Sequence, residues 1–506
     1  MEMNEVETIV SIVTAEDENI SDYIDSPNSL DEFKKPASNT VKDFLMLLNS
    51  EEVKINVELT LEDKNNECNN KSLKNEQQSE ILVTETCKNE DEDRFTENEE
   101  KNQENMMDVD TNNGSNQILE NETKSASKSL EGETQSLNFE YNWTVSQQLL
   151  CSATEEYKAS ENCENFTKGC QWSPDGTCLM VPSEDFRIRI YELPKELYSE
   201  KPTTNLSSST LKSALCVKEG GLIYDSCWYP HMNSWNPATC CFLSTSQETP
   251  IHLWDAFTGE LRATYRAYNQ VDEVEPAISI RFINSGAEVW SGFKGALRKF
   301  DTERPGRQTE DIFLKHDFPT ISGLVSCIRE NPIMPGLVAF GTYSKYIGLY
   351  QNGPVCCFKT NSGVTQLEFS PCGTKLYSAV RRSNEFYCWD LRNPGVVLWS
   401  MENREANTNQ KINFDISKDG STIVSGGVDG VVKVWKVDVV KATEEEAEEL
   451  NPISRISLSK DCINGVSLHG SLPLLATSSG QRICDEREQY RDNSVRLWWF
   501  GNNQRT

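Results

Sequence analysis

The residues of this 506-residue chain that are best suited to chemistry are basic and aromatic, and they do not form a catalytic set. The four histidines do not cluster with the 17 cysteines at zinc-site spacing, and no Cys-x-x-Cys sequence occurs. We find no Ser-His-Asp order, no phosphate-binding loop and no glycine-rich cradle after a strand. His469 precedes a Gly-Ser-Leu-Pro turn, which favours a packing role over a role as a base. The sequence therefore predicts a protein that is not an enzyme and needs no metal or cofactor.

Three basic groups, in residues 281–307, 381–392 and 262–268, are the candidate binding residues. Arginine forks bind phosphate in a bidentate way, and tyrosine rings stack on unpaired bases, so these groups predict contact with RNA. The candidates are Arg262, Arg266, Tyr268, Lys294, Arg298, Lys299, Arg304, Arg307, Arg381, Arg382 and Arg392. The turn Arg304–Arg307 should expose both of its guanidinium groups. The alternative for each group is a surface salt bridge or a solvated charge.

A β-rich repeat must position these groups. Each copy is a short alternating strand that ends in an aromatic anchor, and turns such as Ser370-Pro371-Cys372-Gly373 lie upstream of several anchors. The anchors are Tyr191, Trp254, Phe300, Tyr350, Trp389, Trp435 and Trp498. Their shorter intervals, 39 to 50 residues, match the period of WD-repeat blades. The pattern predicts an all-β fold, a seven-bladed WD-repeat β-propeller, with six or eight blades as alternatives.

The end of the chain indicates how the ring closes. Only eight residues follow Trp498, too few for a loop and an outer strand. The segment Leu137–Leu150, in which Phe139, Tyr141 and Trp143 alternate with polar residues, precedes the first blade. We expect this segment to complete the last blade and to leave no open edge. An open array of sheets is the alternative, and it would leave that alternation without a partner.

Charge divides the chain into two parts. Residues 1–135 hold 34 acidic and 12 basic residues and none of the 11 tryptophans, so they account for −22 of the net charge of −30. Such a segment cannot bury enough apolar surface to offset its ordering entropy. We predict a disordered acidic tail over residues 1–135 and the propeller over 136–506. Polar stretches near 192–218, 436–452 and 483–493 are predicted to be loop insertions.

Other features bear on compartment and partners. The first 20 residues are too acidic for a signal or transit peptide, and no apolar run approaches the roughly 20 residues that span a bilayer. An odd number of cysteines without paired spacing predicts a reducing compartment and buried thiols in a β core. In the tail, the apolar residues of Asp43–Ser50 are suited to folding onto a partner's groove, or they form a residual cluster with no partner.

Several stretches of the body resemble the telomerase Cajal body protein family. The similarity covers about residues 160–500 and not the tail. The stretches that carry it are residues 255–263, 265–269, 304–307, 408–410, 460–469, 471–477 and 479–482. They are far more specific than a general blade pattern.

The resemblance implies a function that spacing alone does not give. Members of this family bind the Cajal body box, a short element in a loop of small Cajal body RNAs, and telomerase RNA where it carries that box. They associate with the dyskerin-containing H/ACA core, with telomerase and with other Cajal body proteins. The resemblance thus implies a non-enzymatic RNA-binding scaffold, located in the nucleus in Cajal bodies and partly in the cytoplasm, that supports telomere maintenance. The alternative is a protein-only WD-repeat adaptor, for example in DNA-damage signalling.

Overall fold

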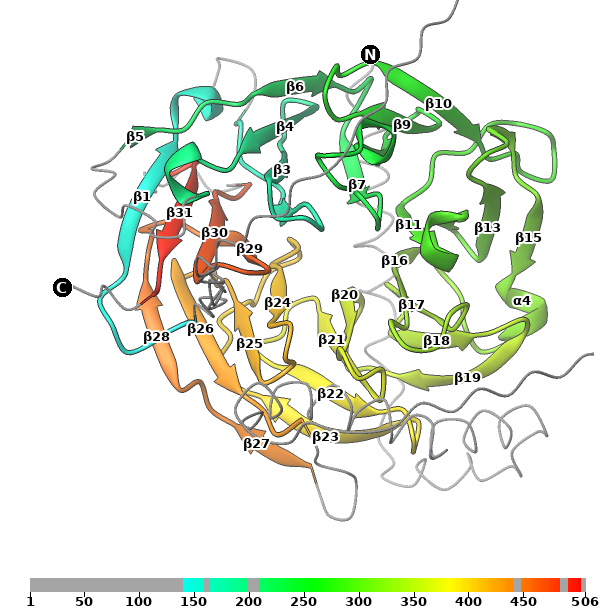
Figure 1. The fold of residues 1–506 in the computed structure, drawn as a ribbon. Helices are drawn as coiled ribbons and strands as arrows, with labels where there is room; N and C mark the ends of the chain where they lie inside the picture. Colours follow the sequence, from blue (N-terminus) through cyan, green and yellow to red (C-terminus); the bar gives the residue numbers. More distant parts are fainter. Residues whose placement is uncertain (1–139, 159–163, 199–208, 440–446, 483–489, 502–506) are drawn as a thin grey trace, which may run out of the picture. The chain divides into compact units, whose positions relative to one another are not determined.

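Seven sheets, each antiparallel in its four main strands, follow one another around a ring in the part of the chain that the structure describes (Figure 1). The structure is a computed structural model, and it describes residues 140–158, 164–198, 209–439, 447–482 and 490–501. This arrangement confirms the predicted seven-bladed all-β propeller. The predicted tail, residues 1–135, lies outside the described residues, together with its Asp43–Ser50 segment.

Each blade has four main strands, which we call a to d from the inner strand to the outer strand (Figure 1). The first four blades consist of β2 (Gln171–Trp172), β3 (Cys178–Pro182), β4 (Arg187–Glu192) and β6 (Leu215–Lys218); β7 (Ile223–Trp228), β8 (Cys241–Ser246), β9 (Ile251–Asp255) and β10 (Leu261–Arg266); β11 (Ser279–Ile283), β12 (Glu288–Phe293), β13 (Ala296–Asp301) and β15 (Glu310–Phe313); and β16 (Val325–Glu330), β17 (Val338–Thr342), β18 (Tyr346–Tyr350) and β19 (Pro354–Lys359).

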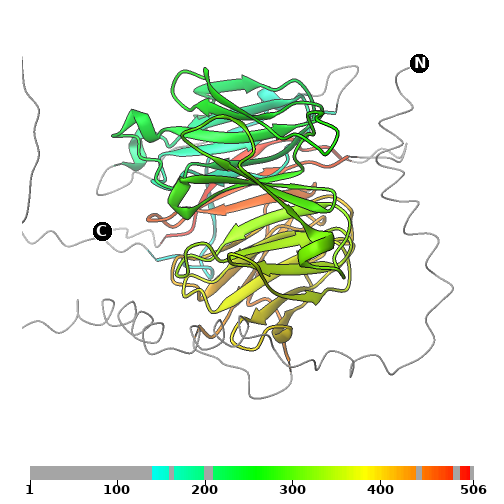
Figure 2. The ribbon, with the colours of Figure 1, turned by 90° about the vertical axis from the view of Figure 1, so that its right-hand side faces the viewer.

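The last three blades consist of β20 (Val364–Phe369), β21 (Lys375–Val380), β22 (Phe386–Asp390) and β23 (Val396–Met401); β24 (Phe414–Ile416), β25 (Thr422–Ser425), β26 (Val431–Lys436) and β28 (Ser454–Ser457); and β29 (Ile463–Leu468), β30 (Leu474–Ser479), β31 (Val495–Trp499) and β1 (Gln148–Ala153). The ring is turned by 90° in Figure 2. Three short strands extend the outer edges of blades: β5 (Ser209–Thr210), β14 (Gly306–Arg307) and β27 (Glu448–Leu450).

All seven predicted anchors lie on the third strand of a blade, as the repeat requires. Six are buried, and Trp254 is half-buried. Three of the tryptophans donate their indole N–H to a hydroxyl on strand b of the same blade: Trp254 to Ser244 at 2.7 Å, Trp389 to Ser378 at 2.7 Å, and Trp498 to Thr477 at 2.9 Å. These bonds satisfy a polar group that would otherwise be buried without a partner.

The N-terminal strand completes the last blade, but it is not the strand that the alternation predicts. β1 pairs antiparallel with β31, from Gln148 opposite Trp499 to Ala153 opposite Val495. The alternating residues before β1 do not form a strand, because the Asn142 side chain accepts the Thr144 N–H at 3.0 Å and turns the chain.

Tyr141 and Trp143 instead pack against the last blade. Their rings stack at 5.1 Å, and Trp143 lies 4.8 Å from Phe500. The Tyr141 hydroxyl donates to the Leu474 carbonyl at 2.8 Å. The prediction that an N-terminal segment completes the last blade is therefore confirmed, but the strand that pairs is Gln148–Ala153 and begins later than predicted. Phe139 lies outside the described residues.

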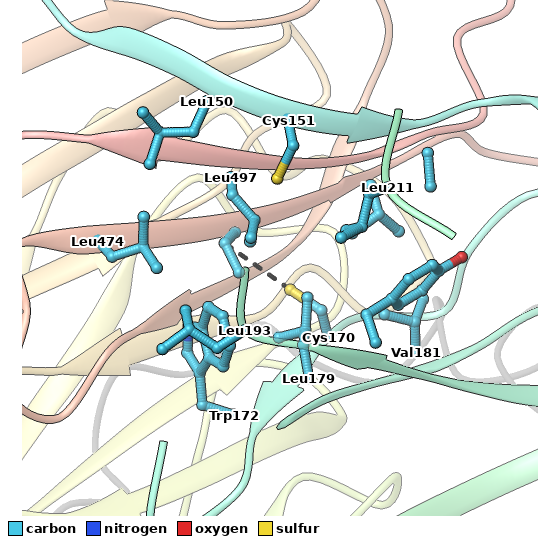
Figure 3. Close-up of a cluster of buried hydrophobic side chains, with 14 of the residues drawn as sticks. Leu150, Cys151, Cys170, Trp172, Leu179, Val181, Leu193, Leu211, Leu474 and Leu497 are labelled. Carbon is cyan, nitrogen blue, oxygen red and sulfur yellow. Dashed lines mark hydrogen bonds between the residues drawn. The ribbon is translucent and has the colours of Figure 1, made fainter. Parts of the chain in front are cut away.

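One buried cluster joins the first and last blades at this closure (Figure 3). Leu150 comes from β1, Leu497 from β31 and Trp172 from β2, and all three side chains are buried. The thiol of Cys170 donates a hydrogen bond of 3.7 Å to the Ala476 carbonyl, which the dashed line in Figure 3 marks. Full burial of a side chain such as leucine contributes about 2 kcal/mol. The closure is thus held by core packing as well as by strand pairing.

Parts of the predicted insertions are sheet. Within 192–218 the structure has a 3-10 helix at Lys195–Leu197, the short strand β5 and the outer strand β6. Within 436–452, β27 pairs in parallel with β23 of the preceding blade. Residues 199–208, 440–446 and 483–489 of these stretches lie outside the described part. The loop interpretation is therefore too broad, because polar outer strands resemble loops in sequence.

Among the described cysteines, most are buried, as the β-core prediction requires. The buried ones are Cys151, Cys170, Cys227, Cys240, Cys241, Cys327, Cys388 and Cys462. Cys216 and Cys357 are exposed, and the remaining three described cysteines are half-buried.

Candidate nucleic-acid interface

The strand connections give the propeller two faces. In an antiparallel four-stranded blade, the a–b and c–d connections lie at one end of the strands, whereas the b–c connections and the links to the next blade lie at the other. We call these ends the a–b face and the b–c face. Each candidate residue can be assigned to one of these two faces from its place along its strand.

Arg298 belongs to the interior of its blade. Its side chain is 4% exposed and lies 4.0 Å from the centre of the Phe293 ring. Its Nε donates to Asp311 at 2.9 Å, and its Nη1 donates to Glu275 at 2.8 Å. A guanidinium buried with two carboxylates has no free fork for phosphate. We expect removal of Arg298 to destabilise the fold, because its loss would leave the carboxylates of Asp311 and Glu275 without their partner.

Three other candidates are also used within the protein. Lys299 forms an ion pair with Glu310 at 2.8 Å, and Arg392 forms one with Asp390 at 2.9 Å. Arg262 donates to Asp255 and to the carbonyl oxygens of Pro237 and Ala238. For these residues, the structure favours the salt-bridge alternative over an RNA contact.

Arg304 and Arg307 are exposed, as their turn predicts. The Arg304 side chain is 87% exposed on the a–b face, and its Nε lies 3.7 Å from Asp301. Arg307 pairs with Asp272 at 2.7 Å and covers the Tyr268 ring at 4.5 Å. The pairing of β14 with β10 places Arg307 beside the exposed Arg266, near the b–c face. The two arginines of the turn therefore do not form one patch.

A set of cations on one face appears only when the b–c connections of successive blades are compared. The b–c turns of the third, fourth and fifth blades carry Lys294, Lys345, and Arg381 with Arg382. Lys315 joins them from α4 (Leu314–Asp317), in the link between the third and fourth blades. We call these five residues the basic arc. Lys294, Lys315, Lys345 and Arg382 are exposed.

The corresponding turns elsewhere carry acidic residues. Glu184 and Asp185 lie in the b–c turn of the first blade, Glu248 in that of the second and Asp429 in that of the sixth. Cations outnumber carboxylates in the b–c turns of the third to fifth blades, where Glu385 is the one carboxylate, whereas the turns of the first, second and sixth blades carry carboxylates and no lysine or arginine. The described part of the seventh blade's connection carries both signs, with Arg482, Arg491 and Asp492. Such an arrangement guides a polyanion to one sector of the ring.

Arg381 connects two blades of the arc. Its guanidinium carbon lies 3.5 Å from the centre of the Tyr343 ring, which is in the b–c turn of the fourth blade. Its Nε is buried and has no hydrogen-bond partner among the described residues. Stacking on Tyr343, and not an ion pair with a carboxylate, therefore holds this side chain among the described residues, in contrast to Arg298.

A hollow of about 440 Å³ lies beside the arc. Lys294, Lys315 and His316 line it together with the apolar side chains of Val271 and Phe313, and the ion pair of Arg298 with Glu275 also lies in its wall. Cations beside apolar walls are suited to an unpaired nucleotide, whose phosphate is charged and whose base has flat apolar faces.

Comparison with known proteins identifies the family. A family model described as "WD domain, G-beta repeat" matches residues 406–436. Telomerase Cajal body protein 1 of Mesocricetus auratus is 40% identical over 388 residues, which cover 72% of this chain and 70% of that protein. Telomerase Cajal body protein 1 of Homo sapiens is 40% identical over 395 residues, which cover 73% and 69%. The chain belongs to the telomerase Cajal body protein family.

A relative with a different name also aligns with this member of the telomerase Cajal body protein family. Guanine nucleotide-binding protein negative regulator 1 of Schizosaccharomyces pombe is 28% identical over 353 residues, which cover 67% of this chain and 86% of that protein. The name of this relative refers to the regulation of a protein.

The sequence did not reveal Lys315, Lys345 or Tyr343 as parts of this surface. The search for groups that are local in sequence favoured 281–307, whereas Lys294, Lys345 and Arg381 lie about one blade apart. The available signal is positional: each of these three residues follows the second strand of its repeat.

Two further observations concern the residues that the structure describes. Where the structure describes the chain, no three His, Cys, Asp or Glu side chains come together in a group that could hold a metal ion. No helix in those ranges has the length and apolar character needed to cross a membrane.

Proposed function

We propose that this chain is a non-enzymatic RNA-binding scaffold whose basic arc contacts the Cajal body box in the loop of small Cajal body RNAs. Telomerase RNA would be a ligand where it carries that box. The observation that supports this proposal most strongly is the placement of cations on three consecutive blades of one face. Family membership supplies the RNA class, because the relatives are named for telomerase and the Cajal body.

The arc is suited to a single-stranded loop rather than to a duplex. Its cations are spread over separate turns, so each can meet a different phosphate of a bent backbone. The Arg381–Tyr343 pair and the hollow beside Lys294 offer a flat surface and an apolar pocket for bases that are not paired. Arg266, Tyr268 and Arg307 extend the same face toward its outer edge.

The same proposal includes the particle that the scaffold serves. The bound RNA would bring with it the dyskerin-containing H/ACA core and telomerase, and contacts with other Cajal body proteins would hold these particles in Cajal bodies in the nucleus. Chemistry on RNA or at telomeres would belong to those partners.

The direct test measures binding of the purified full chain to a loop that carries the box. The arc variant combines Lys294→Ala, Lys315→Ala, Lys345→Ala and Arg382→Ala, four exposed positions. The matched control combines Lys195→Ala, Arg304→Ala, Lys418→Ala and Lys436→Ala, which are exposed positions of the a–b face. Both variants lose the same charge.

We expect the arc variant to bind the box loop about tenfold more weakly or worse, because several phosphate contacts are lost. The control should stay within about twofold of the wild type, since exposed charges farther away than a Debye length are screened at physiological salt. Equal binding by the two variants would refute the placement on the arc. Equal binding of box and scrambled loops by the wild type would favour the protein-only adaptor.

A further inference from the structure

The central channel of the propeller contains charged groups that the proposed RNA surface does not use. A cavity of about 140 Å³ lies among the inner strands. Arg281 on β11, Arg329 on β16 and Lys411 just before β24 line it, and Lys168 lies at its edge with an ion pair to Glu184 at 2.8 Å. The cations come from four different blades, so the fold alone brings them together.

The carboxylates of the channel are committed to the framework. Asp225 accepts the backbone N–H groups of Ser226 and Ile280, both at 3.1 Å. Asp415 accepts those of Ile416 at 2.8 Å and Leu468 at 2.7 Å. The bonds to Ile280 and Leu468 join each strand to the next blade, so these carboxylates stabilise the ring.

The third carboxylate is paired with one of the cations. Glu368 accepts the Nε of Arg329 at 2.7 Å, and the Nη1 of Arg329 donates to the carbonyl of Ile328 at 2.9 Å. The ion pair leaves the second terminal nitrogen of Arg329 available.

Arg281 has no such partner. Among the described residues, its guanidinium makes no hydrogen bond and no ion pair within 4 Å. Burial and the neighbouring charge of Arg329 lower the pKa of Arg281 below its usual value. Lys411 makes one long contact, 3.5 Å, to the Ser326 carbonyl. Three cations thus face a small polar cavity with most of their donors unused, and the carboxylates of Asp225, Glu368 and Asp415 line the same cavity.

We propose that this cavity binds one divalent oxyanion, of the phosphate or sulfate class, between Arg281, Arg329 and Lys411. Guanidinium forks match the oxygen geometry of such anions, and the partial burial of the three cations strengthens the attraction. An oxyanion there would offset the repulsion between the two arginines and tie together the third, fourth and sixth blades. The occupant is either a free oxyanion or a phosphate group of a bound RNA.

Sulfate is the suitable probe, because its charge is constant around neutral pH. Equilibrium dialysis of radiolabelled sulfate against the full chain, with chloride holding the ionic strength constant, measures affinity and stoichiometry. We expect one sulfate per chain and a loss of about tenfold or more in affinity for Arg281→Gln and for Lys411→Gln. Arg304→Gln, at an exposed position outside the channel, should bind sulfate as the wild type does.

Equal affinity of Arg281→Gln and Arg304→Gln for sulfate would overturn the proposal. It would also be overturned if chloride displaced the bound sulfate at the same ionic strength. Where Arg281→Gln fails to fold by circular dichroism, Lys411→Gln decides the question. A short unlabelled RNA identifies the source. Displacement of sulfate by RNA assigns the site to an RNA phosphate, whereas independent binding assigns it to a free oxyanion. Because the dialysis needs no RNA, its result is separate from the test of the basic arc.

Discussion

At the scale of single residues, internal hydrogen-bond partners separate the arginines that build this protein from those free to bind a ligand. Arg298 and Arg262 have the residue type and the local sequence of an RNA contact, yet both use their donors inside a blade. Arg404, 1% exposed, donates to Ser425 at 2.9 Å, and burial lowers its pKa to about 9. Sequence could predict the candidates but not this division, because the division depends on carboxylates and carbonyls from other parts of the chain.

The anchors allow a comparison between two buried tryptophans. The indole N–H of Trp389 donates to Ser378, whereas that of Trp435 has no hydrogen-bond partner among the described residues. We predict that Trp389→Phe destabilises the protein by about 1–3 kcal/mol more than Trp435→Phe, since only the first change leaves a buried hydroxyl without its donor. Urea unfolding followed by far-UV circular dichroism measures the difference. An equal or larger loss for Trp435→Phe would contradict the prediction.

His469 confers a pH dependence on stability. Its Nδ1 accepts the backbone N–H groups of Ser471 and Leu472, and its Nε2 contacts the Gly176 carbonyl at 2.8 Å. Burial lowers the pKa of His469. The Gly176 carbonyl opposes this effect, Lys418 lowers the pKa further and Asp175 raises it, and the net shift is downward. The folded state therefore binds this proton less readily than the unfolded state, so this contribution to stability is lost as the pH falls below about 6.5.

The measurement is the free energy of unfolding at about pH 7.5 and pH 5.5, on either side of the usual histidine pKa. His469→Ala should lose less stability over this interval than the wild type, although it is less stable at the higher pH. His231→Ala, at an exposed position, serves as the control and should follow the wild type. Parallel profiles for the wild type and His469→Ala would show that the imidazole is not the titrating group.

At the scale of elements, the sequence predicts the third strands and the tight turns well. Anchors such as Trp435 follow an alternating strand and a turn such as Asp429-Gly430, and these signals are local. The outer strands are less predictable. β27 is polar and pairs along one edge, so it resembles a loop, and β6 is short and follows a Ser/Thr-rich stretch. The sequence predicts β1 some residues too early, because Tyr141 and Trp143 pack as a cap instead of pairing.

The closing strand should be decisive for stability. Leu150 of β1 is fully buried in the cluster that joins the first and last blades (Figure 3). We predict that Leu150→Ala destabilises the protein by about 2–5 kcal/mol through the lost burial and the cavity left behind. Ser152→Ala, at a half-buried position of the same strand, should have little effect.

Hydrogen exchange gives a second measurement of this closure. In Leu150→Ala, the amides of β30 and β31 should lose protection before those of the fourth blade, because the ring opens where the cluster is weakened. Uniform loss around the ring, or a change in unfolding energy no larger than that of Ser152→Ala, would mean that the closure is not the weak point.

At the scale of the whole molecule, the distribution of charge matters more than its sum. The chain carries a net charge of −30, yet three consecutive blades present cations on one face. Binding that depends on these cations should weaken as salt rises, with a slope of about −0.7 for each phosphate contact on a single strand. The arc variant should therefore have a salt slope shallower by roughly 3 than the wild type, whereas the a–b face control should keep the wild-type slope.

Titration of the box loop at several salt concentrations measures these slopes. A slope that is the same in all three proteins would show that the arc does not neutralise phosphates, even if the affinities differ. The arc could not be predicted from any local group in the sequence, because it arises only when the ring sets the b–c turns of three blades next to one another.

Crosslinking in cells, followed by sequencing of the bound RNA, tests the central claim most directly. The full chain, the arc variant and the a–b face control would be expressed at equal levels and crosslinked under the same conditions. We predict that small Cajal body RNAs crosslink to the wild type and to the control through loops that carry the box, and that these crosslinks are lost from the arc variant. Equal recovery of those loops by all three proteins, or no enrichment of the box with the wild type, would contradict the account.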